Sequence, residues 1–225
     1  MKNKNIFVAC DVSGQKEIMD LLSKVHENIS GIKIGLQYIT QRSPQDIREL
    51  NRFNKPIFYD GKFFDIKNTL VESIKSLKEL KISYATVHLL NGLDALKAAN
   101  KAANDINIKL LGVSVLTSFD NEELAQLGFK NQVKEQVLKL IKIADEANLY
   151  GVICSPLEIK MIKEIAPNLK CFTPGIRQNK NKDDQKRTMN AKQALEEGSD
   201  CLIIGRPITK GDPKKNIQEI LSSLN

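Results

Sequence analysis

The chain has 225 residues, 41% of them hydrophobic, which fits one folded domain spanning residues 1–225. The 34 basic and 27 acidic residues give a net charge of +7, but the lysines are scattered and only 5% of residues are aromatic, so we expect no nucleic-acid partner. No apolar run approaches the ~18 residues of a membrane span and no secretory signal follows residues 1–5, so we expect a cytoplasmic protein without membrane contact.

Short apolar runs rich in β-branched residues alternate with longer amphipathic segments along the chain. The runs predict eight strands, at residues 6–11, 31–35, 56–59, 84–88, 109–116, 151–154, 170–173 and 200–205. The segments between them predict helices at residues 15–27, 66–80, 93–105, 132–148, 157–166, 191–197 and 216–224. Strands that alternate with helices pair in parallel, and eight such units favour a closed (β/α)8 TIM barrel of the α/β class over an open doubly wound sheet.

Ionic side chains lie in or after the first three predicted strands, near the end of a barrel where active sites form. Asp11 ends the first strand, Lys33 lies between two isoleucines in the second, and Asp60 and Lys62 follow the third. Because side chains alternate along a strand, Lys33 lies on the face of the sheet opposite to its isoleucine neighbours. An unpaired ammonium group inside a barrel is costly, so Lys33 needs carboxylate partners there. Asp60 and Lys62 point the same way if the backbone is extended, and Asp65 follows within one turn.

Two interpretations of these charges remain open. They can form a structural network of ion pairs that closes the top of the barrel. Alternatively, a lysine between two carboxylates stays protonated and fixed in place, which suits a general acid that delivers a proton to carbon. Alternating charges that converge at this end favour the catalytic interpretation. The carboxylates are also suited to a divalent cation, but the lysine beside them competes for that role.

The fourth and fifth predicted strands bring His88 and Thr117 to the same end of the barrel. His88 is either a ligand contact or a hydrogen-bonded structural histidine. The only other histidine, His26, falls in a predicted helix, so a metal site or a Ser–His relay is not expected.

The seventh and eighth predicted strands each end in a turn with a glycine and an arginine: Gly175 and Arg177, then Gly205 and Arg206. Glycine lets main-chain N–H groups approach an anion, and arginine offers a forked donor to phosphate oxygens. Either turn alone is compatible with a solvated loop. Their coincidence after strands seven and eight, where barrels commonly hold phosphate, predicts a phosphate site beside the polar loop 178–186.

The four cysteines are separated along the chain, and each lies in or beside an apolar run. Without a C-x-x-C pair, they indicate buried thiols rather than a zinc or redox site. They are Cys10, Cys154, Cys171 and Cys201.

Residues 60–69, DGKFFDIKNT, resemble the D-x-K-x-x-D-I-x-N-T signature of the orotidine 5'-phosphate decarboxylase family in its short bacterial form. The shorter D-x-K-x-x-D pattern is shared with related sugar-phosphate barrels, whereas the Ile-x-Asn-Thr extension favours the orotidine family. The chain departs from the family at Asn190, where a Thr-Pro pair commonly begins the next helix; asparagine is a good N-cap, so this helix start is expected to survive. Further blocks resemble the family in the same order, at residues 115–118, 173–177, 184–187 and 204–209.

The resemblance implies decarboxylation of orotidine 5'-monophosphate to uridine 5'-monophosphate and CO2, the last step of de novo pyrimidine nucleotide synthesis, without a cofactor or metal. It implies that Lys62 donates the proton to C6 of the pyrimidine as the carboxylate leaves. The implied charge network comprises Lys33, Asp60, Lys62 and Asp65. In the family the second aspartate of the signature is contributed to the neighbouring subunit, so the resemblance also implies a homodimer with Asp65 shared across the interface.

The resemblance further implies which residues bind the nucleotide. Asp11 and Lys33 are expected at the ribose hydroxyls, Thr69 beside the ribose at the subunit boundary, and Thr117 at the pyrimidine edge. Asp60 is expected near the substrate carboxylate. The residues implied for the phosphate are Arg177, Gln185, Gly205 and Arg206, with the loop 178–186 closing as a lid.

Two other functions stay open from the sequence. One is a Mg²⁺-dependent sugar-phosphate decarboxylase or synthase of the same barrel superfamily, which would show a magnesium requirement. The other is a nucleotide- or RNA-binding protein without activity, which would show basic residues clustered away from the barrel rim. Such clustering is not seen in the sequence.

Overall fold

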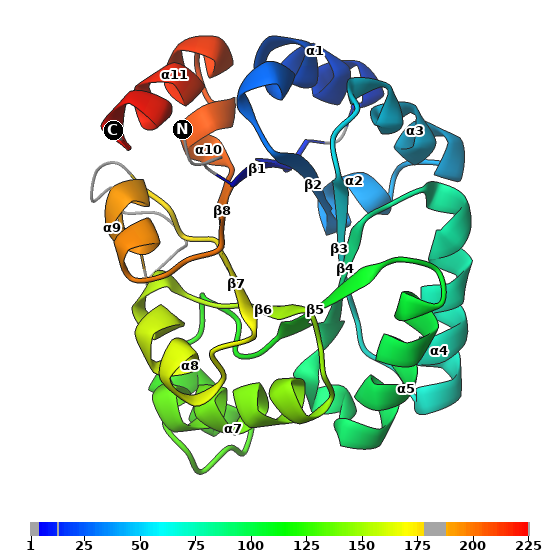
Figure 1. The fold of residues 1–225 in the computed structure, drawn as a ribbon, viewed down its shortest axis with the longest axis vertical. Coiled ribbons are helices and arrows are strands. Elements are labelled where there is room, and N and C mark those ends of the chain that lie inside the picture. The colour runs from blue at the N-terminus through cyan, green and yellow to red at the C-terminus, as the bar shows by residue number, and fades with distance from the viewer. Residues whose placement is uncertain (1–4, 13, 178–187, 225) are drawn as a thin grey trace.

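A computed structural model describes residues 5–12, 14–177 and 188–224, which form a closed barrel of eight parallel strands inside a ring of helices (Figure 1). The strands pair in sequence order, and β1 also pairs with β8 to close the barrel. This confirms the predicted (β/α)8 barrel and excludes the open sheet. The strands are β1 (Ile6–Cys10), β2 (Gly31–Gly35), β3 (Ile57–Phe63), β4 (Tyr84–His88), β5 (Lys109–Val113), β6 (Gly151–Ile153), β7 (Lys170–Thr173) and β8 (Cys201–Ile204).

Helices cover the outside of the barrel. Within the described residues, none of them is long and apolar enough to cross a membrane. The α-helices are α1 (Gln15–Val25), α2 (Leu36–Ile39), α3 (Pro44–Glu49), α4 (Lys67–Ser76), α5 (Leu93–Asn104), α6 (Asn121–Gln126), α7 (Val133–Glu146), α8 (Ile159–Ile165), α9 (Ala191–Glu196), α10 (Arg206–Thr209) and α11 (Pro213–Ser223). The 3-10 helices are η1 (His26–Asn28), η2 (Leu50–Phe53), η3 (Leu77–Leu80), η4 (Leu89–Asn91) and η5 (Pro156–Glu158).

The helices form where an apolar stripe recurs at helical spacing. In α7 the stripe of Val137, Leu140 and Ile141 is buried, as the period of residues 132–148 predicts. The N-terminus of α9 is capped by Asn190, whose side chain accepts a hydrogen bond from the Gln193 N–H at 2.8 Å. The predicted start of this helix is therefore confirmed despite the missing Thr-Pro pair.

Two apolar layers lie on either side of the sheet because side chains alternate along each strand. One layer packs between strands and helices and includes Ile32 and Ile34 of β2. The other fills the lumen, so the barrel is solid below its C-terminal end. The lumen residues are Phe7, Ala9, Phe58, Leu111, Phe172, Cys201 and Ile203. All four cysteines are buried free thiols, as predicted.

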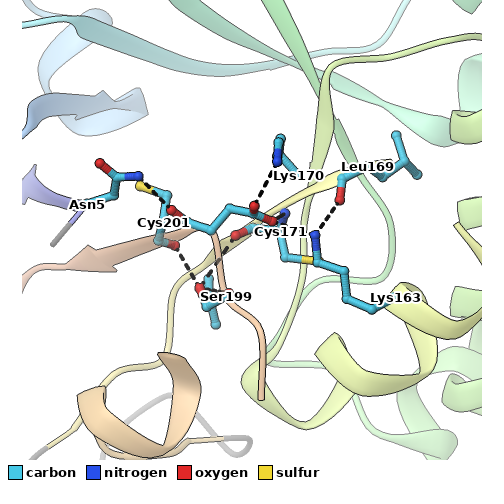
Figure 2. Close-up of polar contacts among 9 residues, drawn as sticks. Asn5, Lys163, Leu169, Lys170, Cys171, Ser199 and Cys201 are labelled. Carbon is cyan, nitrogen blue, oxygen red and sulfur yellow. Dashed lines mark hydrogen bonds and ion pairs between the residues drawn. The ribbon is translucent and has the colours of Figure 1, made fainter. Parts of the chain in front are cut away.

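Polar residues at the N-terminal end of the barrel join α8, β7 and β8 (Figure 2). The Asp200 carboxylate accepts from Lys163 at 2.6 Å, from Lys170 at 3.1 Å and from the Cys171 N–H at 2.9 Å. Burial alone would raise the pKa of Asp200, but these hydrogen bonds and the Lys163 charge hold the pKa below its ordinary value. A network at this end of a barrel serves stability rather than catalysis, because the active-site loops lie at the opposite end.

Several elements differ from the sequence-based prediction. Strand β3 continues to Phe63 rather than ending at Tyr59, and β5 ends at Val113 rather than at residue 116. Four short helices, α2, α3, α6 and α10, were not predicted. Each has only four to six residues, too few for a helical period to emerge from the apolar pattern. Helix α11 begins at Pro213, with Asp212 as its N-cap, three residues before the predicted start.

Candidate active site

A cavity of about 230 Å³ opens at the C-terminal ends of the strands, above the apolar filling of the lumen. Its base is formed by lumen residues such as Phe58 and Ile203. Eight residues proposed from the sequence border it, in the strands or in the segments that follow them. They are Asp11, Lys33, Asp60, Lys62, Thr117, Arg177, Gly205 and Arg206.

Asp60 lies at the centre of a chain of alternating charges on one side of this cavity. Its residue is only 6% exposed, and Oδ2 lies 2.9 Å from Nζ of Lys62 and 3.1 Å from Nζ of Lys33. Nζ of Lys33 lies a further 3.5 Å from Oδ1 of Asp11. The predicted inward direction of Lys33 is confirmed, and the structure gives its ammonium the carboxylate partners that it needs.

The charges of this network stabilise one another. Burial alone would raise the pKa of the Asp60 carboxyl, but the charges of Lys33 and Lys62 hold that pKa below its ordinary value. Burial alone would lower the pKa of Lys33, but the charges of Asp60 and Asp11 raise it above its ordinary value. At neutral pH Asp60 is therefore an anion and Lys33 a cation, inside a site where little water screens them.

Gly35 makes room for the ion pair beside it. A Cβ atom at this position would lie 3.1 Å from Nζ of Lys33 and 3.2 Å from Oδ1 of Asp11. A side chain here would require these two charged groups to move by a few tenths of an ångström, so the glycine that ends β2 leaves room for the ion pair.

The backbone at Lys62 departs from the extended geometry considered for this segment. Lys62 has φ 49°, in the left-handed region, and the register between β3 and β4 shifts between Tyr59 and Phe63. Lys62 still reaches Asp60, but it does so from a bulge rather than from a regular strand. Backbone strain of this kind in a non-glycine residue is concentrated at functional sites.

Thr86 is a site residue that the sequence analysis missed. It is fully buried in β4; its hydroxyl donates to Oδ1 of Asp60 at 3.0 Å and accepts from the Lys62 N–H at 2.8 Å. The sequence did hold a signal, since Tyr84, Thr86 and His88 alternate with Ala85 and Val87 along the strand. The candidate residues were taken from strand ends, whereas Thr86 lies in the middle of β4.

Asp65 and Thr69 lie outside the cavity of this chain, and both are exposed. Within one chain, the charge that extends the network is Asp11 rather than Asp65. The Asp65 N–H donates to Oδ1 of Asn91 at 3.1 Å, which ties the segment after β3 to the turn after β4. Asn91 was not selected from the sequence, because it follows the strand end by three residues, in the short segment that forms η4.

The two arginines predicted for phosphate also border this cavity, after β7 and β8. Arg177 and Arg206 border the cavity together with Gly205 and Thr117. Arg206 is the first residue of α10 rather than part of a turn, which corrects the prediction for that segment. Gln185 and the loop 178–186 lie outside the described residues.

His88 lies beside Lys62 at the end of β4. Its Nδ1 accepts from the Leu90 N–H at 3.3 Å, and its ring packs against Phe64 with 5.6 Å between centroids. Burial, and to a smaller extent the charge of Lys62, lower the pKa of His88 below its ordinary value. His88 is not among the residues that line the cavity, so the geometry favours the structural interpretation. In residues 5–12, 14–177 and 188–224, no three His, Cys, Asp or Glu side chains gather in a manner suited to a metal ion.

Comparisons with known proteins agree over nearly the whole chain. The sequence model of the orotidine 5'-phosphate decarboxylase / HUMPS family matches residues 4–220. The chain is 38% identical over 221 residues to the orotidine 5'-phosphate decarboxylase of Wolbachia pipientis subsp. Culex pipiens (strain wPip), covering 97% of this chain and 98% of that protein. It is 40% identical over 224 residues to that of Legionella pneumophila (strain Corby), covering 97% and 96%. The crystal structure of orotidine 5'-phosphate decarboxylase from Lactobacillus acidophilus matches with a TM-score of 0.86 and 32% identity, covering 99% of both chains.

Proposed function

The chain belongs to the orotidine 5'-phosphate decarboxylase / HUMPS family, and we propose that Lys62 donates the proton when it converts orotidine 5'-monophosphate to uridine 5'-monophosphate and CO2. It is a carboxy-lyase of pyrimidine nucleotide synthesis. The observation that carries the proposed role is the position of Lys62, which borders the cavity and is held 2.9 Å from the buried carboxylate of Asp60.

The charge network fits the demand of this reaction. When the C6 carboxylate leaves as CO2, an electron pair remains on a ring carbon that has no conjugated sink. An ammonium group already in place stabilises that developing charge, and transfer of its proton to C6 gives the product. Asp60 and Lys33 hold Lys62 at this position, and no step requires a metal ion or cofactor.

The arginines after β7 and β8 are suited to the phosphate of the substrate. Arg177, Gly205 and Arg206, which border the cavity, would hold the phosphate oxygens together with Gln185 from the loop 178–186. The binding energy of this remote phosphate holds the reacting ring against Lys62. The phosphate thereby accelerates the chemical step although it does not contact the reacting carbon. Asp11 and Lys33 would contact the ribose hydroxyls, and Thr117 the pyrimidine edge.

We further propose that two chains share each site. Asp65 and Thr69 are exposed and outside the cavity of their own chain. The same rim, after β2, β3 and β4, exposes four large apolar side chains, which is typical of a surface covered by another protein. They are Leu36, Phe64, Ile66 and Leu90, between 42% and 74% exposed. In a homodimer, Asp65 and Thr69 would complete the partner's site, with Asp65 next to Lys62 and Thr69 at the ribose.

The test is turnover of orotidine 5'-monophosphate, followed by the loss of substrate absorbance with and without a chelator. We expect the wild type to be insensitive to the chelator. We expect Lys62→Ala to lower kcat/KM by at least about 10³-fold, since both the proton donor and the stabilising charge are removed. Lys97→Ala is the matched control, because Lys97 pairs with Glu146 on the exposed outer surface, 3.3 Å away.

Two results would count against the proposal. Substantial turnover by Lys62→Ala would exclude this lysine as the proton donor. A wild type that loses activity with chelator and regains it with Mg²⁺, or that accepts a ketose phosphate instead, would favour the sugar-phosphate branch of the family.

A further inference from the structure

Thr86 joins the two residues at the centre of the charge network through a single oxygen atom. Its side chain is fully buried in the middle of β4 and does not line the cavity. The hydroxyl donates its proton to Oδ1 of Asp60 at 3.0 Å and accepts the N–H of Lys62 at 2.8 Å. One group therefore contacts both the carboxylate and the main chain of its lysine partner.

The bond to Asp60 decides how that carboxylate is oriented. Oδ1 is occupied by Thr86, so Oδ2 alone faces Lys33 at 3.1 Å and Lys62 at 2.9 Å. Rotation of the carboxylate would break the hydroxyl bond and separate Oδ2 from both lysines. Because Asp60 is buried, Oδ1 has little water to replace Thr86.

The hydrogen bond from the Lys62 N–H to Thr86 satisfies a main-chain donor that the bulge removes from the regular strand pairing. The β3–β4 register shifts between Tyr59 and Phe63, and Lys62 takes a left-handed conformation there. A main-chain N–H in such a segment requires a partner outside the regular ladder. The Thr86 hydroxyl is that partner, so it stabilises the backbone conformation from which Lys62 projects into the cavity.

We propose that Thr86 is a positioning residue for decarboxylation, whose hydroxyl fixes the Asp60 carboxylate and the Lys62 backbone so that the Lys62 ammonium stays at the reacting carbon. This inference rests on the proposed function of Lys62. Thr86 does not contact the substrate, and it acts only through its two neighbours.

The experiment compares Thr86→Val, which keeps the shape but removes the hydroxyl, with Thr86→Ser, which keeps the hydroxyl. We expect Thr86→Val to lower kcat about 10- to 100-fold, the range set by losing a buried hydrogen bond to a charged group. KM should stay within about 2-fold of the wild type, since the proposed phosphate contacts after β7 and β8 supply binding. Thr86→Ser should recover kcat to within about 5-fold of the wild type.

Thr173→Val is the matched control, because Thr173 is equally buried in β7 and its hydroxyl accepts from Ser199 at 2.8 Å, away from the charge network. It should lose thermal stability without losing kcat. If Thr86→Val does not fold, Thr86→Cys replaces it, and its weak S–H donor should give a kcat between those of the serine variant and Lys62→Ala.

Hydrogen exchange of the Lys62 amide gives a second readout that does not depend on turnover. We expect this amide to be protected in the wild type and in Thr86→Ser, and to exchange faster in Thr86→Val while neighbouring β4 amides stay protected. Equal kcat in the wild type and Thr86→Val, or an equal loss in Thr86→Ser, would overturn the role of Thr86. A wild type without turnover but with the expected exchange pattern would instead count against the proposed function alone.

Discussion

At the residue scale, the site depends on how a buried carboxylate is partnered. Asp60 remains charged at 6% exposure because two lysines share one of its oxygens and a threonine hydroxyl occupies the other. Removal of any one partner leaves a buried charge or acceptor unsatisfied, which costs more than the lost contact itself is worth. The network is therefore sensitive to substitutions that leave the overall fold intact.

The lowered pKa of His88 leads to a prediction about how the free energy of unfolding depends on pH. Its folded-state pKa lies below the ordinary value of 6.5, because burial and then the charge of Lys62 disfavour the protonated ring. Below pH 6.5 the unfolded chain binds a proton at His88 that the folded protein does not, so this contribution to stability is lost as the pH falls toward the folded-state pKa. We expect His88→Asn to lose less free energy of unfolding than the wild type between about pH 7.5 and about pH 5.5.

Urea unfolding curves at the two pH values measure this difference. Asparagine keeps an oxygen that can accept the Leu90 N–H, so the comparison isolates the titrating ring. An equal loss of stability in the variant and the wild type would contradict the neutral, half-buried state of His88.

At the scale of elements, the seam between β3 and β4 positions the functional residues. The bulge at Lys62 and the turn after β4 meet there, and Asn91 joins them with three hydrogen bonds. Its Nδ2 donates to the carbonyls of Phe63 at 2.9 Å and His88 at 2.7 Å, and its Oδ1 accepts from the Asp65 N–H at 3.1 Å. The direction of the segment that carries Asp65 therefore depends on a side chain of the neighbouring unit.

We expect Asn91→Ala to lower the free energy of unfolding by about 1–3 kcal/mol and also to reduce kcat/KM, because the Asp65 segment loses its anchor. Asn100→Ala is the matched control. Asn100 is buried and donates to the carbonyls of Ala147 and Asn148 at 3.3 and 2.8 Å, far from the cavity. It should lose comparable stability while kcat/KM is unchanged. If both variants lose activity to the same extent, the effect of Asn91 is one of stability alone.

At the scale of the whole molecule, the barrel separates its charged groups into two ends. The Asp200 network joins α8, β7 and β8 at the N-terminal end, whereas Asp60 and its lysines border the cavity at the C-terminal end. The exposed apolar side chains after β2 to β4 lie at the functional end, beside Asp65. An interface on this rim would both cover apolar surface and complete the site.

The proposed dimer predicts that two inactive variants restore activity when mixed. A hybrid of Asp65→Asn and Lys62→Ala chains has one site with both residues intact and one site with neither. Random exchange at equal concentrations should give about a quarter of wild-type activity, because half of the dimers are hybrids with one working site. Each variant measured alone is the control. No recovery after exchange has been verified by mass spectrometry would contradict a shared site.

Most of the fold could be predicted from the sequence, because the alternation of apolar runs and amphipathic segments is a local property of the chain. Among the described residues, the eight strands and seven of the α-helices follow from it, whereas the short helices α2, α3, α6 and α10 do not, since their caps and tertiary contacts define them. For the candidate site, the charged residues were found from strand ends and from the resemblance of residues 60–69. Thr86 and Asn91 were missed because their roles depend on pairing between β3 and β4.

The motif of Asp60, Lys62 and Asp65 shows where this division lies. The sequence by itself determined that these residues lie near the C-terminal end of the third strand of a barrel and that they resemble a decarboxylase signature. Only the tertiary structure decided which charges meet: Lys33 and Asp11 join Asp60, while the Asp65 side chain is exposed outside the cavity of its own chain. Distances between strands depend on register, bulges and barrel closure, and no local pattern in the chain specifies these.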